Sequence, residues 1–148
     1  MDILSPEFSN NNYLPQKYTC DGEGINPPLK FQDIPESARS LVLIVDDPDA
    51  PMGDFVHWTV WNINPSVKEI AEDSVPLDGM EGITDFGSSG YGGPCPPDGA
   101  HHYHFKLYAL DIRLSLDSQA KKRDIEIAMQ GHILDEALLV GLYKRNNK

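Results

Sequence analysis

Basic residues are scarce in this sequence. Its 148 residues include 12 Lys and Arg against 23 Asp and Glu, which gives a formal net charge of −11. A surface with this charge repels the phosphates of nucleic acids and of anionic lipid head groups. We therefore expect no nucleic-acid partner and no stable association with membranes.

The sequence also lacks any long apolar run. A membrane-spanning helix needs about 20 mostly apolar residues, and no stretch approaches that length. The N-terminal segment carries an early acid, Asp2, and has neither the basic start nor the apolar core of a signal peptide. These absences predict a cytoplasmic protein, and the length predicts a single domain over residues 1–148.

Cysteine is nearly absent. Cys20 and Cys95 are too few for a disulfide scaffold, and their spacing matches no zinc motif. In a reducing compartment they would be thiols unless the fold brings them together, which the sequence leaves open. Cys95 lies between Pro94 and Pro96, so no helix begins there to activate its thiol, which argues against a catalytic nucleophile.

A loop rich in glycine and proline runs directly into a strand pattern. Residues 92–99 contain three glycines and three prolines, which predicts a rigid, shaped loop. From residue 101 to 110 the chain alternates, with His101 and Tyr103 on one apolar face and the next two histidines on the other. His101 and Tyr103 are therefore predicted to lie side by side at the mouth of a buried face.

Two further strands are predicted at the centre of a sheet. Residues 40–46 are a continuous run of leucine and β-branched residues, typical of a strand that is buried on both faces. Residues 55–64 are largely apolar on both faces. Strict alternation along this second strand places His57 on the same face as Trp61 and Ile63.

The N-terminal third and the middle of the chain show weaker patterns. Prolines and turn residues interrupt residues 3–31, which predicts short edge strands and loops. Residues 65–90 predict a long excursion in which 67–70 is the only regular piece. Long ordered loops in small domains commonly carry function.

The C-terminal part predicts one helix and one strand. Apolar residues among charges indicate a helix over residues 118–130, with Asp117 or Ser118 as its N-cap and Gly131 as its stop. Residues 138–143 contain poor helix formers, so we expect a strand there.

Polar side chains converge on one region of the predicted sheet. Three acids and two prolines form an acidic loop over residues 46–51, directly after the first central strand. The candidate site residues from this loop and from the strands are Asp47, Asp49, His57, His101 and Tyr103. Imidazoles and a phenol can donate hydrogen bonds into one cavity, and a carboxylate can set the protonation of a histidine. This combination suits a phosphate or carboxylate group.

Two other chemistries remain open for these residues. His57, His101 and Asp47 are ordinary metal ligands, although strand alternation sends His102 and His104 away from a shared site. An enzyme could use the same carboxylate and histidines as base and acid. The sequence contains no nucleophile elbow, P-loop or zinc motif, so we expect no enzyme, no cofactor and no metal.

Several motifs together resemble the phosphatidylethanolamine-binding protein family, also called the Raf kinase inhibitor protein family. They are DDPDAP at 46–51, VHW at 56–58 and GGPCPPDGAHHY at 92–103. Further similarity lies in YTCDGEGINPPLKF at 18–31 and AMQGHILDEALLVGLY at 128–143, so the resemblance spans nearly the whole chain. It points to the short bacterial and archaeal branch.

The resemblance implies a fold and a site. The fold is mainly β, a large antiparallel sheet packed on a smaller sheet with Greek-key links, and one or two short helices including one near the C-terminus. The site is an anion pocket at one end of the sheet, and its family positions fall on Asp47, Asp49, His57, Gly93, Pro96, Pro97, His101 and Tyr103. The family usually has Arg where this chain has His102, and this chain shows no counterpart of the pocket-bordering C-terminal helix of animal relatives.

The resemblance also implies a function. We expect a small ligand-binding or regulatory protein that recognises a phosphate, a carboxylate or a phosphorylated partner. A kinase or a protease is the expected protein partner, and bacterial relatives that look dimeric make a homodimer an expectation. The alternative is a hydrolase-like enzyme or a metal-binding protein that uses the same Asp, His and Tyr residues.

Overall fold

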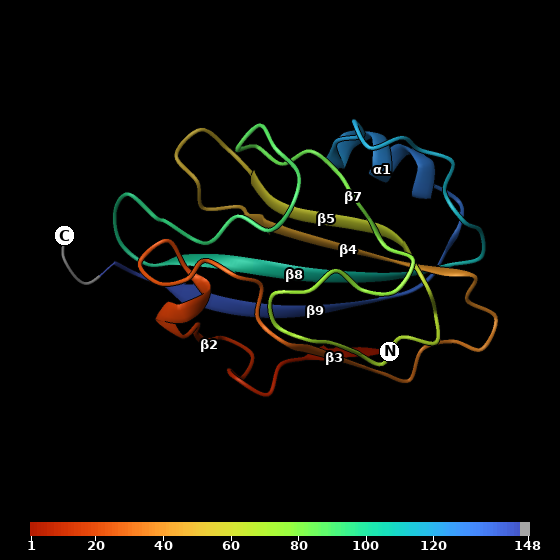
Figure 1. The fold of residues 1–148 in the computed structure, drawn as a ribbon, viewed down its shortest axis with the longest axis horizontal. Coiled ribbons are helices and arrows are strands. Elements are labelled where there is room, and N and C mark those ends of the chain that lie inside the picture. The colour runs from red at the N-terminus through yellow and green to blue at the C-terminus, as the bar shows by residue number, and fades with distance from the viewer. Residues whose placement is uncertain (146–148) are drawn as a thin grey trace.

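The computed structural model of the protein describes residues 1–145 and is built mainly of strands (Figure 1). Its strands are β1 (Asp2–Leu4), β2 (Asn12–Tyr13), β3 (Leu29–Gln32), β4 (Ser40–Asp47), β5 (Phe55–Ile63), β6 (Glu69–Ile70), β7 (Met80–Glu81), β8 (His101–Leu110) and β9 (Ile133–Tyr143). The helices are a short 3-10 helix η1 (Gln16–Tyr18) and an α-helix α1 (Lys122–Met129). Neither helix of this part of the chain is long and apolar enough to cross a membrane.

The strands form two sheets, as the family resemblance implied. The larger sheet has the order β2-β9-β8-β4-β5-β7 and the smaller one the order β1-β3-β6. All long pairs are antiparallel, and only the short pair β2–β9 is parallel. After β5 the chain passes through β6 in the smaller sheet and β7 at the edge of the larger one. It then returns as β8, which pairs with β4 on the side opposite to β5. The four long strands lie side by side across the centre of Figure 1.

The larger sheet packs on both of its faces. One face meets the smaller sheet through a core that includes Trp58, Phe105 and Leu107. The other face meets α1, where Trp61 packs with helix residues such as Ile125. Because β4 lies in the middle of the sheet, all eight of its residues are buried, which confirms the two-sided burial predicted for residues 40–46.

The alternation predicted for β5 is wrong at both ends, because the strand contains two irregularities. Val45 pairs with Trp58 while the next residue, Asp46, pairs with Val56, so His57 is an extra residue with no cross-strand partner. Such a bulge redirects a side chain. The His57 ring therefore lies on the face of Trp58 and against Tyr103, with ring centroids 5.3 Å apart, and not on the face of Trp61.

The second irregularity lies at the end of β5. Asn62 has a left-handed φ of 57°, and the register shifts between the pairs at Leu41 and Leu43. As a result Ile63 packs in the core between the two sheets, whereas Trp61 packs under α1. A backbone turned by one left-handed residue no longer follows a period of two, which is why the sequence pattern misplaced Ile63.

The helix is shorter than predicted. It begins at Lys122 and not near Asp117, because the Asp117 carboxylate accepts a hydrogen bond from the Gln119 amide in a separate turn. The Ala120 carbonyl then accepts a hydrogen bond from Ile83, which keeps this segment extended. Gly131, with φ of 80°, follows the helix as predicted.

Two strands differ from the predictions, one in its length and one in that it was not predicted. The last strand, β9, begins at Ile133 and not at residue 138, because its first half pairs with the end of β8. In the excursion 65–90, β6 coincides with the predicted regular piece, but β7 was missed. Only two residues of β7 pair with β5, too few to leave a periodic pattern.

Candidate functional site

A cavity of about 220 Å³ opens at one end of the larger sheet. Because β4 is antiparallel to both β5 and β8, the end of β4 and the starts of β5 and β8 meet at the same edge. The glycine-proline loop closes the cavity from the side. Its lining residues are Asp47, Ala50, Pro51, Phe55, His57, Phe86, Cys95, Pro96, Pro97, His101 and Tyr103.

Six of the eight predicted site residues line this cavity: Asp47, His57, Pro96, Pro97, His101 and Tyr103. A larger, more open groove of about 740 Å³ lies over residues 31–38 and 65–68, but its lining includes no histidine or tyrosine. A second open groove, over the outer face of β8 and β9, contains His104, Lys106, Tyr108 and Glu136, but none of the predicted site residues.

His101 is held by a carboxylate. Its Nδ1 lies 2.6 Å from Oδ2 of Asp47, and both side chains are less than one-tenth exposed. The other oxygen of Asp47 accepts a hydrogen bond of 2.8 Å from the Asp49 amide. A carboxylate accepts and does not donate, so the proton of the pair lies on Nδ1 of His101 and Nε2 is left for the cavity.

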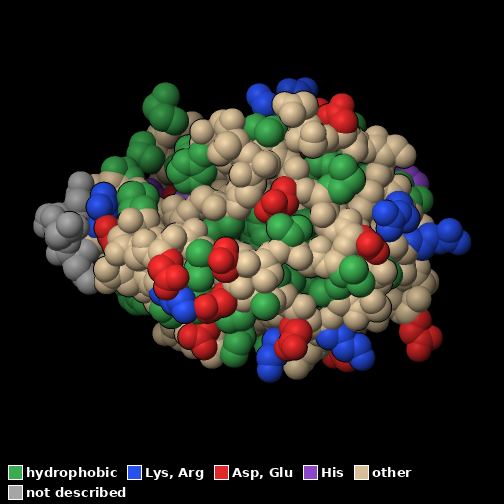
Figure 2. Space-filling model, in the orientation of Figure 1, with side chains coloured by type: hydrophobic (Ala, Val, Ile, Leu, Met, Phe, Trp, Pro, Cys, Tyr) green, Lys and Arg blue, Asp and Glu red, His purple; other side chains and the backbone are tan. Residues whose placement is uncertain are grey.

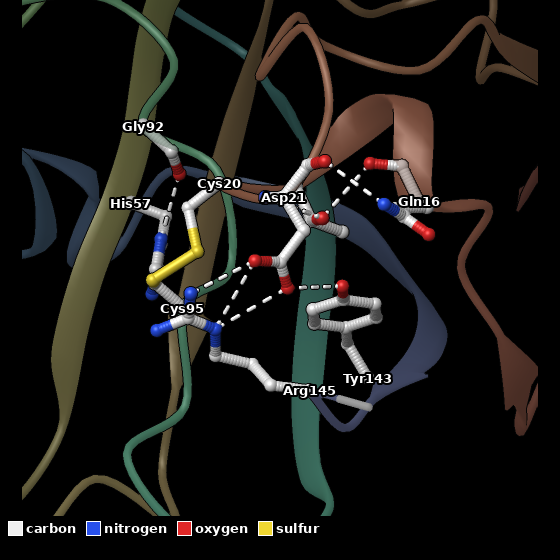
Figure 3. Close-up of a disulfide and its surroundings, with 9 residues drawn as sticks. Gln16, Cys20, Asp21, His57, Gly92, Cys95, Tyr143 and Arg145 are labelled. Atoms are coloured by element: carbon white, nitrogen blue, oxygen red, sulfur yellow. Dashed lines mark hydrogen bonds and ion pairs between the residues drawn. A yellow bond between two sulfur atoms is a disulfide. The ribbon is translucent and has the colours of Figure 1, made fainter. Parts of the chain in front are cut away.

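His57 is held by a backbone carbonyl. Its Nδ1 donates to the Gly92 carbonyl at 2.7 Å (Figure 3). Burial lowers the pKa of His57, while the Gly92 carbonyl and nearby carboxylates, Asp47 foremost, act in the opposite direction. The ring is therefore neutral at neutral pH, with a free acceptor at Nε2.

Tyr103 lies between the two histidines. Its ring is perpendicular to that of His57 and stacked with that of His101, at centroid distances of 5.3 and 6.4 Å. The side chain is 1% exposed, and burial raises the pKa of its hydroxyl above the usual range. The phenol therefore stays protonated and can act as a hydrogen-bond donor.

Aromatic rings that the sequence did not single out complete the cavity. Phe55 and Phe86 lie against the His57 ring, with centroids 5.1 and 5.3 Å away. Phe55 is the first residue of a predicted strand, and Phe86 belongs to the long excursion, where no periodicity marks it. The cavity is thus apolar apart from a few groups, as ligand pockets generally are.

Asp49 and Gly93 do not line the cavity. The Asp49 carboxylate accepts from the backbone and the ring of His102, at 2.8 and 2.7 Å, so it ties the acidic loop to β8 from outside. These hydrogen bonds also lower the pKa of Asp49. Gly93 lies against Thr19, where a Cβ would come within 2.9 Å of backbone. Both residues support the walls.

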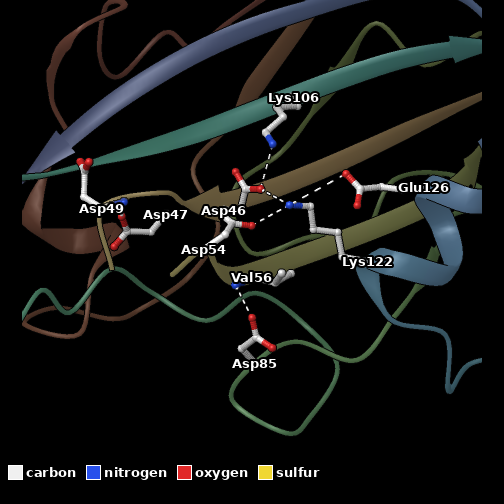
Figure 4. A network of polar contacts seen from close by, with 9 residues as sticks. All are labelled: Asp46, Asp47, Asp49, Asp54, Val56, Asp85, Lys106, Lys122 and Glu126. Atoms are coloured by element: carbon white, nitrogen blue, oxygen red, sulfur yellow. Dashed lines mark hydrogen bonds and ion pairs between the residues drawn. The ribbon is translucent and has the colours of Figure 1, made fainter. Parts of the chain in front are cut away.

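The acids before Asp49 separate to opposite faces of β4. Asp47 faces the cavity, whereas Asp46 faces α1 and accepts from Lys106 and Lys122, each at 2.8 Å (Figure 4). Lys122 also reaches Asp54, 2.6 Å away. The lysines compensate the buried charge of Asp46, while burial and the neighbouring Asp46 raise the pKa of Asp54.

Cys20 and Cys95 form a disulfide, which settles the question that the sequence left open. The Cys20 amide also donates to the Pro94 carbonyl at 3.0 Å. The bond joins the N-terminal segment to a lining residue of the cavity (Figure 3). Next to it, Asp21 accepts from Tyr143 and Arg145, which fixes the same wall to the end of β9.

The metal-centre alternative finds no ligand set in residues 1–145. No group of three or more His, Cys, Asp and Glu side chains in this part of the chain is arranged to hold a metal ion. His102 faces Asp49 outside the cavity, and His132 pairs with Asp111 at 2.8 Å. The cavity contributes only two imidazoles and a carboxylate that one of them already occupies.

Comparison with known proteins places the chain among curated relatives. The family model described as phosphatidylethanolamine-binding protein matches residues 4–144. A UPF0098 protein of Pyrococcus horikoshii is 51% identical over 96% of this chain and 76% of its own length. A UPF0098 protein of Aquifex aeolicus is 47% identical over 99% of this chain and 90% of its own length.

Two solved structures share the fold closely. A putative phosphatidylethanolamine-binding protein homolog from Chlamydia trachomatis superposes with a TM-score of 0.95 at 43% identity, covering 98% of this chain and 97% of that one. YbcL of Escherichia coli, described as a new member of the mammalian family, gives 0.91 at 29% identity, covering 98% of both chains. The chain therefore belongs to the phosphatidylethanolamine-binding protein family, in its short bacterial and archaeal branch.

Proposed function

We propose that this protein binds a small anionic group, a phosphate or a carboxylate, in the cavity at the end of the larger sheet. The observation that carries the proposal is the arrangement of two imidazoles whose Nδ1 atoms are held by Gly92 and Asp47. Their Nε2 atoms and the Tyr103 hydroxyl are then available to an occupant of an otherwise apolar cavity.

The size of the cavity limits the ligand. About 220 Å³ is less than the roughly 300–1,000 Å³ of pockets that hold drug-sized molecules. A phosphate, a carboxylate or a phosphorylated side chain fits such a volume, whereas the acyl chains of a lipid would have to remain outside. We therefore propose a free small anion or a phosphorylated group on a partner as the ligand.

Binding is favoured over catalysis by the absence of a nucleophile beside the Asp47–His101 pair. The lining residues of the cavity include no serine or threonine, and Cys95 is bonded to Cys20 in the described part of the chain. A paired carboxylate and histidine need a group to activate. Relatives named in the comparisons carry no enzymatic names. We propose a binding or regulatory protein, with a kinase or a protease as its partner.

The homodimer and the cytoplasmic location remain predictions. The disulfide bears on the location, because thiols of most cytosolic proteins are kept reduced. Trapping thiols with an alkylating reagent immediately upon cell lysis tests it. A fully alkylated pair of cysteines fits a reducing compartment, whereas an intact disulfide argues for an oxidising one.

Calorimetric titration of phosphate into the wild type, His101→Ala and His102→Ala tests the proposed function. His101→Ala removes one of the polar groups of the cavity and should weaken binding by about 1–3 kcal/mol, because a ligand oxygen loses its partner. His102→Ala, on the outer side of β8, should bind as the wild type does. Equal affinities for wild type and His101→Ala would show that the cavity is not the site.

A further inference from the structure

The proton of the His57 ring is placed by the backbone. Nδ1 donates to the Gly92 carbonyl at 2.7 Å, and the Gly92 amide donates back to the His57 carbonyl at 2.9 Å. A carbonyl oxygen can only accept, so Nδ1 must carry the hydrogen. A neutral ring then has a bare lone pair at Nε2, which makes no hydrogen bond within residues 1–145.

The clamp leaves little freedom for another arrangement. A Cβ on Gly92 would lie 2.1 Å from the Phe86 ring, so glycine lets this ring pack directly over the backbone that holds the histidine. Phe55, Phe86 and Tyr103 surround the imidazole, which is 4% exposed. If the ring turned over, Nδ1 would lose its hydrogen bond to the Gly92 carbonyl. Little water is in reach to replace that bond.

The surroundings keep this ring neutral near pH 7. Desolvation lowers the pKa of His57. The Gly92 carbonyl and the carboxylates of Asp47, Asp46 and Asp85 favour the charged form, but Asp46 is compensated by two lysines and Asp47 is bonded to His101. Nε2 of His57 is therefore a hydrogen-bond acceptor, in a cavity that is expected to receive an anion.

We propose that His57 Nε2 accepts a hydrogen bond from the bound group, so that the cavity selects an anion that carries its own proton. This inference rests on the proposed function and specifies its ligand. Inorganic phosphate keeps a P–OH group at neutral pH, whereas sulfate and phosphodiesters have none, and a phosphomonoester, whose second pKa is about 6, has mostly lost its own. An unprotonated oxygen would place its lone pairs against that of Nε2, and both groups would be buried without a partner.

The other polar groups suit the remaining oxygens of such a ligand. The Tyr103 hydroxyl stays protonated and can donate to a ligand, with the Asp47 carboxylate as a competing acceptor. His101 Nε2 becomes a donor when that ring is protonated, and the resulting charge would be balanced by Asp47 at 2.6 Å. A ligand with one hydroxyl and several anionic oxygens therefore matches one fixed acceptor and the nearby donors. Sites built around a specific hydrogen bond reject analogues that lack it.

Calorimetric titration of phosphate and of sulfate at pH 7.5 and equal ionic strength tests this inference. We expect phosphate to bind the wild type at least roughly tenfold more tightly than sulfate, because sulfate leaves a buried acceptor unpaired. Methyl phosphate and dimethyl phosphate extend the comparison to the monoester and diester chemistry of free phosphates and lipid head groups. At pH 7.5 both esters should bind more weakly than inorganic phosphate, because the diester has no P–OH group and most of the monoester has lost its own.

The variant His57→Gln and the matched control His132→Gln identify the residue responsible. A carboxamide offers an N–H donor as well as an acceptor, so it can bind an oxygen with or without a proton. In His57→Gln the ratio of the affinities for phosphate and sulfate should therefore fall toward one. His132 bonds to Asp111 far along the sheet, and His132→Gln should keep the wild-type ratio. Should His57→Gln not fold, the wild-type comparison still decides the question.

The outcomes separate the two proposals. Equal wild-type affinity for phosphate and sulfate would overturn the selection of a protonated anion and leave the anion site standing. An unchanged ratio in folded His57→Gln would also overturn the role of His57. If neither anion binds the wild type at millimolar concentration, the proposed phosphate site itself is wrong.

Discussion

The two cavity histidines are held in different ways, and each arrangement has a consequence that a single substitution can measure. His101 is bonded to the carboxylate of Asp47, whereas His57 is bonded to a neutral carbonyl and enclosed by rings. Burial therefore acts against a charged His57.

Acid should destabilise the protein through His57. The unfolded histidine takes up a proton near pH 6.5, while the folded one, whose pKa is lowered by burial, does so at lower pH. Between these values the unfolded state binds more protons, so the free energy of unfolding falls as the pH drops below about 6.5. Urea unfolding of the wild type and His57→Gln between pH 7.5 and 5 measures this. If the free energy of unfolding falls equally with pH in both proteins, the role of His57 is contradicted.

A side chain at Gly92 should displace the Phe86 ring. An added Cβ would lie 2.1 Å from that half-exposed ring, which must move outward, so Gly92→Ala should cost about 1 kcal/mol of stability. The double variant Phe86→Ala/Gly92→Ala removes the obstructing ring and should be less sensitive to the added methyl than the wild-type background is. A Gly92→Ala protein as stable as the wild type would show that the loop relaxes freely.

At the scale of elements, α1 is fastened to the sheet by a buried ion network. Asp46 is 1% exposed as a side chain, and it bonds Lys106 of β8 and Lys122 of α1 (Figure 4). Burial disfavours the Asp46 carboxylate, but the two lysines hold its pKa below the usual range. One oxygen of Asp46 has no partner in the described residues, so the network depends strongly on the lysines.

Removing the Asp46 carboxylate should therefore lower the stability of the folded protein. Asp46→Ala leaves Lys106 without its carboxylate and Lys122 with Asp54, which should cost up to about 3 kcal/mol, the lower end for a broken buried pair. Glu126→Ala is the control, because Glu126 is half exposed and 3.9 Å from Lys122. Its loss should change stability by no more than about 1 kcal/mol. Chemical unfolding of both variants compares them, and equal effects would contradict a special role for Asp46.

The disulfide fastens the loop that forms the cavity wall. It joins residues 75 positions apart, so in the chain-entropy account it should contribute about 4 kcal/mol to stability. We expect the paired variant Cys20→Ser/Cys95→Ser to unfold at lower denaturant concentration than the wild type and to be insensitive to a reducing agent. A wild-type protein equally stable with and without the reducing agent would contradict this contribution.

For the whole molecule, residue patterns predicted the parts whose geometry is regular. The alternation in β8 correctly put His101 and Tyr103 on one buried face, and the apolar run of β4 correctly indicated the centre of the sheet. The position of His57 was not predictable from alternation, because a bulge in its pairing with β4 depends on the partner strand. The acidic loop before it and the family motifs, not periodicity, associated His57 with His101 and Tyr103.

Features formed between distant segments left no sequence signal of their own. The Cys20–Cys95 bond and the contribution of Phe86 arise only when loops from different parts of the chain meet. One group of carboxylates gathers toward the lower left of the face shown in Figure 2, and the whole chain carries a formal net charge of −11. An anion must therefore reach the cavity against the overall field, so its binding depends on short-range hydrogen bonds.

Nitrogen-15 NMR of the five histidine side chains during a phosphate titration tests the central claim most directly. The account predicts that the ring nitrogens of His57 and His101 shift in a saturable way, because both line the cavity. The rings of His102, His104 and His132 should remain unchanged. Shifts confined to these three histidines, or none at all at saturating phosphate, would contradict an anion site between His57, His101 and Tyr103.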